Sequence, residues 1–109
     1  MDDLAYLKKK LPEYKRDQIV FSIHATIRMI ERRLDEEEIV ENLLNPKRLE
    51  YVIKVSKGKY LCYFGYSKTR CHKYIIVLLK NLLIVSVMKI NRRWQRIVEK
   101  KARKNETKI

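Results

Sequence analysis

Three side chains suited to phosphate chemistry recur at helical spacing in the first third of the chain. His24, Arg28 and Arg32 are each four residues apart, so a helix would place them along one side. RNA cleavage without a metal needs a base for the 2′-hydroxyl, an acid for the leaving oxygen and cations for the phosphate. His24 is the candidate base or acid, and the two arginines are candidate phosphate ligands. The alternative is structural, with His24 capping a strand–helix junction and the arginines bonding an acidic helix.

The second histidine, His72, could complete an acid–base pair. It follows the basic residues Lys68 and Arg70 and stands at the start of an apolar run. It would act in catalysis if the fold brings it near His24. A lone histidine at the end of a strand is otherwise a surface residue. Lys68 and Arg70 are candidate nucleic-acid contacts in either case.

An aromatic segment at residues 60–66 offers surfaces on which bases could stack. Alternate residues of a strand point to opposite faces, so Tyr63 lies on the face opposite to Tyr60, Phe64 and Tyr66. We expect Tyr60 and Phe64 in the core. Tyr63 and Tyr66 are the candidate RNA contacts near an open face of the sheet.

The C-terminal segment is strongly basic. Glu99 is the single acid between Arg92 and Lys104. We expect a helix whose apolar side docks on a sheet and whose basic side lies along a phosphate backbone. A solvated basic face is the alternative. The candidate nucleic-acid contacts here are Arg92, Arg93, Arg96 and Lys100.

The overall charge favours a polyanionic partner. The 109 residues include 26 Lys and Arg against 13 Asp and Glu, a net charge of +13. Such a charge repels itself in the compact state, and RNA or another nucleic acid would neutralise it. The alternative is that the charge serves solubility alone.

Five of the acids gather in the window 35–41, which predicts the start of a helix. Asp35 and Glu38 form a capping-box-like pair, and acids in the first turn match the helix dipole. Glu37 and Glu41 share a face, but a hard cation needs ligands that converge from several turns. We expect no metal and no cofactor. The acids could instead pair with basic groups of this chain or of a partner.

The two cysteines, Cys62 and Cys71, are too few for a disulfide scaffold and have no metal-binding spacing. We interpret both as reduced thiols of a cytoplasmic protein. Asp2 and Asp3 stand where a signal peptide would be basic and then apolar, so no signal peptide is expected. The longest apolar stretch, residues 74–88, is too short and interrupted to span a bilayer, so no membrane partner is expected.

Two further helices are predicted in the first part of the chain. The first covers residues 2–11 and ends at Pro12. The second covers residues 23–33 and has Ser22 as its N-cap. We expect its apolar stripe to face the core. That stripe consists of Ile23, Ile27, Ile30 and Leu34.

The second half changes to a strand pattern. Lys57-Gly58 and Lys80-Asn81 mark tight turns, and a helix over 92–104 with Asn91 as N-cap follows the last strand, before a frayed tail at 105–109. The sequence therefore predicts one α+β domain over residues 1–109, with N-terminal helices, a four-stranded antiparallel meander and a C-terminal helix. The predicted strands are 49–56, 59–66, 73–79 and 82–90.

One segment resembles a known family. His24-Ala25, Arg28-Met29 and Arg32 match the His-Ala-x-x-Arg-Met-x-x-Arg signature of an uncharacterised family of small prokaryotic domains, and the likeness extends over roughly residues 19–90. Arg33 stands where that family has glycine. The family resembles the RelE/BrnT-like toxins, which implies a RelE-like fold, metal-independent endoribonuclease activity and an acidic antitoxin partner.

Overall fold

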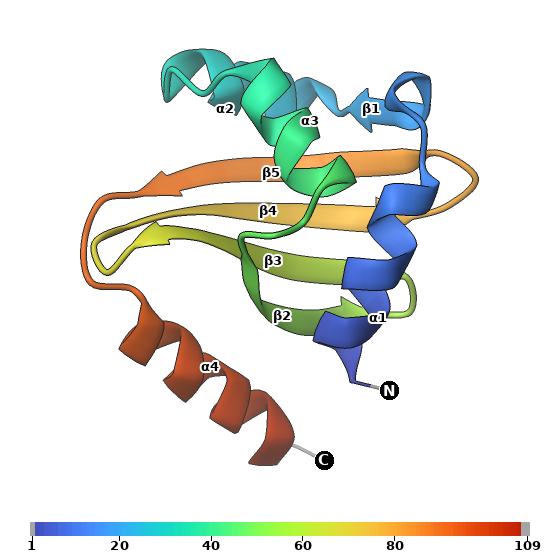
Figure 1. The fold of residues 1–109 in the computed structure, drawn as a ribbon. Coiled ribbons are helices and arrows are strands. Elements are labelled where there is room, and N and C mark those ends of the chain that lie inside the picture. The colour runs from blue at the N-terminus through green and yellow to red at the C-terminus, as the bar shows by residue number, and fades with distance from the viewer. Residues whose placement is uncertain (1, 108–109) are drawn as a thin grey trace.

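A five-stranded mixed sheet forms the centre of the computed structural model, which describes the backbone of residues 2–107 and side chains up to residue 101 (Figure 1). The strand order is β1-β5-β4-β3-β2, and every neighbouring pair is antiparallel except β1 and β5. The strands are β1 (Ile19–Phe21), β2 (Leu49–Ser56), β3 (Lys59–Ser67), β4 (Arg70–Leu78) and β5 (Leu82–Ile90). The helices are α1 (Asp3–Lys10), α2 (Ile23–Glu31), α3 (Glu36–Leu44) and α4 (Gln95–Thr107).

The α+β class is confirmed, and the four predicted strands are present as the antiparallel run β2 to β5. The predicted sheet was incomplete, because a fifth strand, β1, pairs with β5 in parallel and makes the sheet mixed. A C-terminal helix is present, but with another start than predicted. Gly58 has a φ of 76° in the turn between β2 and β3, a conformation that favours glycine. The strand predicted to begin at residue 73 begins earlier, at Arg70, so a tight turn joins β3 to β4. The parallel strand β1 was not predicted, because three residues are too few to show an alternating pattern.

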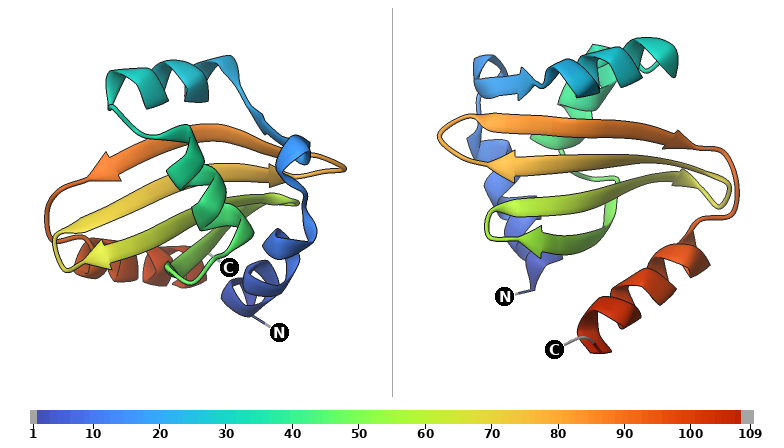
Figure 2. Two further views of the ribbon diagram at one scale, coloured as in Figure 1. Left: turned by 45° about the horizontal axis from the view of Figure 1, so that its top comes forward. Right: turned by 180° about the vertical axis from the view of Figure 1, so that it is seen from behind.

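The first core lies between the sheet and the helices α1 and α3, which cover the same face of the sheet (Figures 1 and 2). Tyr60 and Phe64 are buried in it, as expected. Among its fully buried side chains are Leu7, Leu11, Ile39, Leu43, Tyr74 and Ile76.

The second core lies on the opposite face, where α4 covers β2 and β3. Trp94 and Val98 pack there against Ile53, Leu61 and Tyr63. Tyr63 is therefore buried, and the prediction that it lies on an open face was wrong, because α4 covers its part of the sheet. The helix begins at Gln95, so the expected start at Arg92 with Asn91 as N-cap was also wrong. Part of the expected frayed tail, residues 105–107, belongs to α4, and residues 108–109 lie outside the described residues.

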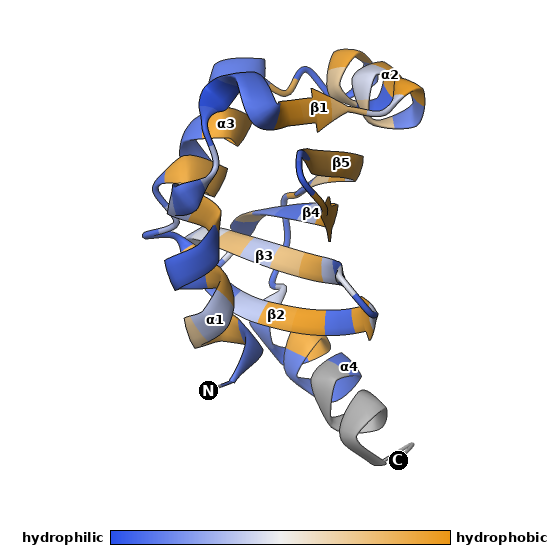
Figure 3. Cartoon of the chain, turned by 90° about the vertical axis from the view of Figure 1, so that its right-hand side faces the viewer, coloured by the Kyte–Doolittle hydropathy of each residue, from blue (hydrophilic) through white to orange (hydrophobic). Residues whose placement is uncertain are grey.

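Helix α2 lies at the edge of the sheet, beyond β5. Ser22 caps it as expected, since its Oγ accepts a hydrogen bond from the Ala25 amide at 3.0 Å. Its isoleucines do not face the core: Ile23, Ile27 and Ile30 are 82%, 52% and 71% exposed. Figure 3 shows hydrophobic stretches, in orange, along α2 at the edge of the sheet. The expected orientation of the stripe was wrong, because α2 is buried along the side that carries Ala25.

The end of α2 is a Schellman motif with a strained residue. The Leu34 amide donates to the Met29 carbonyl at 2.9 Å, and the Arg33 amide donates to the Ile30 carbonyl at 3.2 Å. Arg33 has a φ of 53°, the only positive φ of a non-glycine residue in the described chain. The motif is normally closed by glycine, because a Cβ crowds the left-handed conformation.

The acidic start of α3 is exposed and pairs with this chain's own basic residues. Arg16 forms ion pairs with Glu36, at 3.8 Å, and with Glu37. Asp35 precedes the helix, but its side chain makes no capping hydrogen bond, so the capping-box prediction was wrong. No helix of residues 2–107 is long and apolar enough to cross a membrane.

Candidate functional site

A network of buried polar side chains lies where α3 crosses the ends of β3 and β4. The Asn42 amide donates to the hydroxyls of Tyr66, at 2.8 Å, and Tyr74, at 2.9 Å. The Tyr74 hydroxyl lies 2.7 Å from Nδ1 of His72. The Tyr66 and His72 rings lie 4.8 Å apart, centroid to centroid. We call this network, together with Glu38, the His72 cluster.

The hydrogen bonds favour one tautomer of the neutral His72 ring. The Tyr74 oxygen accepts from Asn42, so its own hydrogen is free to be donated to Nδ1 of His72. The neutral imidazole then carries its hydrogen on Nε2. That atom lies 3.9 Å from Oε1 of Glu38. Protonation of His72 would create an imidazolium beside a carboxylate.

The surroundings favour the neutral imidazole. Burial lowers the pKa of His72, the carboxylate of Glu38 opposes that shift, and Lys89, Arg70 and Arg48 lower the pKa further. Lys89 is the neighbour of His72 across the β4–β5 ladder. Three cations therefore lie near an uncharged ring and the Glu38 carboxylate, and their positive charge would attract an anion.

The two tyrosines of the cluster act as hydrogen-bond donors and acceptors and do not ionise. Burial is the main cause of the raised pKa of Tyr66 and of Tyr74. The Arg48 guanidinium lies 4.3 Å from the centre of the Tyr66 ring, which adds a cation–π contact. A cavity of about 560 Å³ opens beside the cluster, and Asn42 and Arg48 line it.

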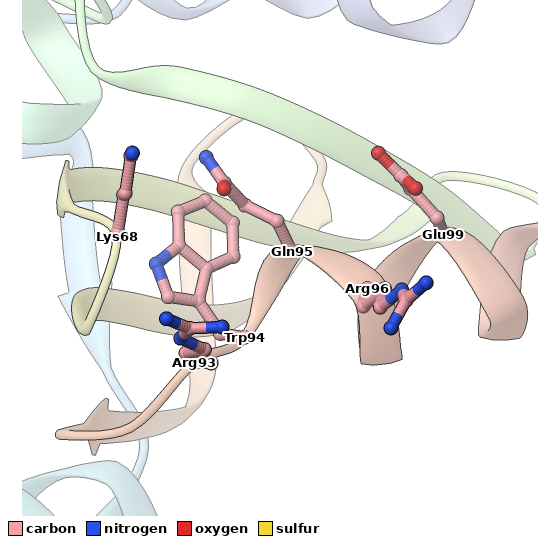
Figure 4. Close-up of a pocket in the computed structure, with 6 residues that line it drawn as sticks. All are labelled: Lys68, Arg93, Trp94, Gln95, Arg96 and Glu99. Carbon is pink, nitrogen blue, oxygen red and sulfur yellow. The ribbon is translucent and has the colours of Figure 1, made fainter.

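A second cavity, of about 330 Å³, lies between the β3–β4 turn and the start of α4 (Figure 4). We call it the α4 pocket. Trp94 forms the floor of this pocket. Its indole N–H donates to the Ser67 carbonyl at 2.9 Å, and its ring stacks on Tyr63 with the ring centroids 6.3 Å apart. The residues that line the pocket are Lys68, Arg93, Trp94, Gln95, Arg96 and Glu99.

Most of the predicted site residues fall into three groups, and Tyr63 is in none of them because it is buried under α4. His72 and Tyr66 belong to the His72 cluster, with Arg70 nearby. Lys68, Arg93 and Arg96 line the α4 pocket, whereas the exposed Arg92 and Lys100 do not. The third group belongs to α2: His24 and Arg28 lie on the helix, and Arg32 is its C-cap residue.

The α2 residues are separate from the His72 cluster. His24 and Arg32 are exposed, and Arg28 pairs with Glu31 of its own helix at 3.8 Å. No hydrogen bond or ion pair in the described part of the chain joins His24 to His72. The imidazole pair that the sequence suggested is therefore not assembled by these contacts.

Glu38, Asn42 and Arg48 were not predicted as site residues. Asn42 could have been found from the sequence, because it is a polar residue on the side of α3 that carries Ile39 and Leu43. A buried amide needs hydrogen-bond partners, so its position indicates a polar network in the core. Arg48 gives no such signal, because it follows α3 in a loop and reaches the site only through the fold.

Comparisons of the chain with protein-family models, with curated proteins and with solved structures found no match. Among the residues with described positions, no three His, Cys, Asp or Glu side chains converge as metal ligands. Both cysteines are free and buried, and burial raises the pKa of each thiol.

Proposed function

We propose that this chain binds RNA and cleaves it without a metal ion at the His72 cluster. One observation carries the proposal: the Glu38 carboxylate and Nε2 of His72 lie 3.9 Å apart. Positive charge lies near this pair, since Arg48, Arg70 and Lys89 each lower the pKa of His72. The net charge of +13 supports a polyanionic substrate.

The pair has the chemistry that phosphodiester cleavage needs. The Glu38 carboxylate removes the proton of a 2′-hydroxyl, and the 2′-oxygen attacks the adjacent phosphorus. The bond from phosphorus to the 5′-oxygen breaks, and the imidazolium form of His72, which is the minor form at neutral pH, donates its Nε2 proton to that oxygen. The products are a 2′,3′-cyclic phosphate and a 5′-hydroxyl. Arg48 and Arg70 stabilise the negative charge that develops on the phosphate oxygens.

A second function, RNA binding without cleavage, is favoured by the burial of His72. Its side chain is 5% exposed, against 43% for Glu38. A histidine held by Tyr74 at this depth can also serve only to orient the polar network. The RelE-like fold and the acidic antitoxin partner that the sequence resemblance implies stay predictions.

The test is cleavage of end-labelled single-stranded RNA in EDTA at about pH 6, because burial lowers the pKa of His72 and its imidazolium form becomes more abundant as the pH falls. We expect Glu38→Gln to lower the cleavage rate by about 10²-fold or more, the usual effect of losing a general base. Glu38 is partly exposed, so this change leaves the core intact. Glu36→Gln is the matched control, because it alters an exposed carboxylate of the same helix turn that pairs with Arg16.

Equal cleavage by the wild type and by Glu38→Gln would reject the proposed base. If His24→Gln loses cleavage while Glu38→Gln stays active, the catalytic site includes α2 and not the His72 cluster. Retention of RNA by the wild type without any cleavage would establish the binding function instead.

A further inference from the structure

The α4 pocket has a net positive charge and a floor formed by the buried Trp94. Lys68 projects from the β3–β4 turn, Arg93 lies just before α4, and Arg96 lies in the first turn of α4 (Figure 4). The one carboxylate, Glu99, accepts a hydrogen bond from the Tyr51 hydroxyl at 3.0 Å. The three cations therefore outnumber a carboxylate that already has a partner.

Trp94, which forms the floor of the pocket, is held in place by contacts on several sides. Besides its hydrogen bond and its stacking on Tyr63, Trp94 meets the Tyr51 ring edge-on at 5.8 Å. Gly65 lies beneath it, where a Cβ would come within 2.9 Å of Cζ2 of Trp94 and would also clash with Glu50. A glycine is thus required here for the close approach of strand and indole. A rigid site loses little freedom when a ligand binds.

The pocket and the His72 cluster lie at the same end of the β3–β4 hairpin. Tyr66 belongs to the cluster, and the next residues, Ser67 and Lys68, hold Trp94 and line the pocket. The two sites are on opposite faces of the sheet, because α3 covers one and α4 the other (Figure 2). A single strand that passes around the hairpin end could reach both.

We propose that the α4 pocket binds one nucleotide of the RNA strand, outside the nucleotides that are cut. Arginine side chains bind a phosphate bidentately, and Arg93 and Arg96, which line the pocket together with Lys68, supply the positive charge that a phosphate needs. The Gln95 amide can hydrogen-bond the edge of a base that lies against the Trp94 end of the pocket. This inference rests on the proposed function for the identity of the strand.

The test uses adenosine 5′-monophosphate, which carries one base and one phosphate and cannot be cleaved at the His72 cluster. Trp94 is the only tryptophan, so the protein has one indole N–H resonance that reports on the pocket. We expect saturable movement of that resonance, and at least tenfold weaker binding in Arg93→Gln/Arg96→Gln. Lys57→Gln/Lys80→Gln is the control, because it removes the same charge at the turns of the opposite end of the sheet and should bind as the wild type does.

Failure of the resonance to move, or equal weakening in the two double variants, would overturn the inference. A parallel titration with inorganic phosphate should saturate at higher concentration, and equal affinity for the two probes would reject a base subsite. The result is independent of cleavage, because Glu38→Gln should bind the nucleotide unchanged. A protein that cleaves RNA but does not bind the nucleotide would lose this inference and keep its proposed function.

Discussion

His72 links the polar network to the pH dependence of folding. Burial is the main reason why its pKa in the folded chain lies below the ordinary value of 6.5. Above pH 6.5 the residue is neutral in both states and costs no stability. As the pH falls below 6.5, the unfolded chain takes up a proton first, so stability is lost until the folded pKa is reached. We expect a lower urea midpoint at pH 5.5 than at pH 7.5.

A histidine variant isolates this effect, because the chain has 2 histidines. His72→Gln should unfold at lower urea at both pH values and show a smaller difference between them. His24→Gln removes an exposed imidazole and should keep the wild-type difference. The same pH difference in both variants would show that another group is responsible.

At the scale of elements, the end of α2 carries strain that one substitution can remove. Arg33 closes the Schellman motif in the left-handed region, at a φ of 53°. Glycine adopts that conformation freely, so Arg33→Gly should raise the free energy of unfolding by about 1 kcal/mol. Arg32→Gly is the matched control: it removes the same charge at a φ of −93° and should not stabilise. Chemical denaturation of both variants measures the difference, and equal effects would mean that Arg33 is not strained.

The faces of α2 show where prediction from sequence ends. The isoleucine spacing correctly predicted a helix and Ser22 correctly predicted its start. The periodicity of the sequence shows that one face of the helix is more apolar than the other. It does not show which face packs against the rest of the protein. Because α2 lies at the edge of the sheet, the small residue Ala25 is buried and Ile23 and Ile30 are exposed. Only the tertiary arrangement could reveal this.

The candidate site was predictable to a similar degree. Strand alternation correctly separated Tyr63 from Tyr66, but which face α4 would cover was not readable from β3 itself. His72 was a candidate from its chemistry alone. Its partners, Glu38 and Arg48, come from elements far away in the sequence, and only the packing of α3 on the sheet brings them to it.

At the scale of the whole molecule, the distribution of charge matters more than the net value of +13. The proposed strand would meet Arg48, Arg70 and Lys89 around the His72 cluster on one face. On the other face it would meet the cations of the α4 pocket. Each phosphate contact releases counterions, so the binding constant falls as the salt concentration rises. The slope of log binding constant against log salt concentration is proportional to the number of contacts.

This count gives a quantitative prediction for single-stranded RNA. With all the cations of both sites engaged, the slope of log binding constant against log salt concentration should be about −4, from about −0.7 per contact. Arg93→Gln/Arg96→Gln should reduce its magnitude by about 1.4, the share of two contacts. Lys57→Gln/Lys80→Gln should leave the slope unchanged, although its net charge is the same as that of the pocket variant. Filter binding measures all three slopes, with Glu38→Gln added to each protein so that the RNA is cut much more slowly. If the two double variants change the slope equally, RNA is attracted by the overall charge and not by these two sites.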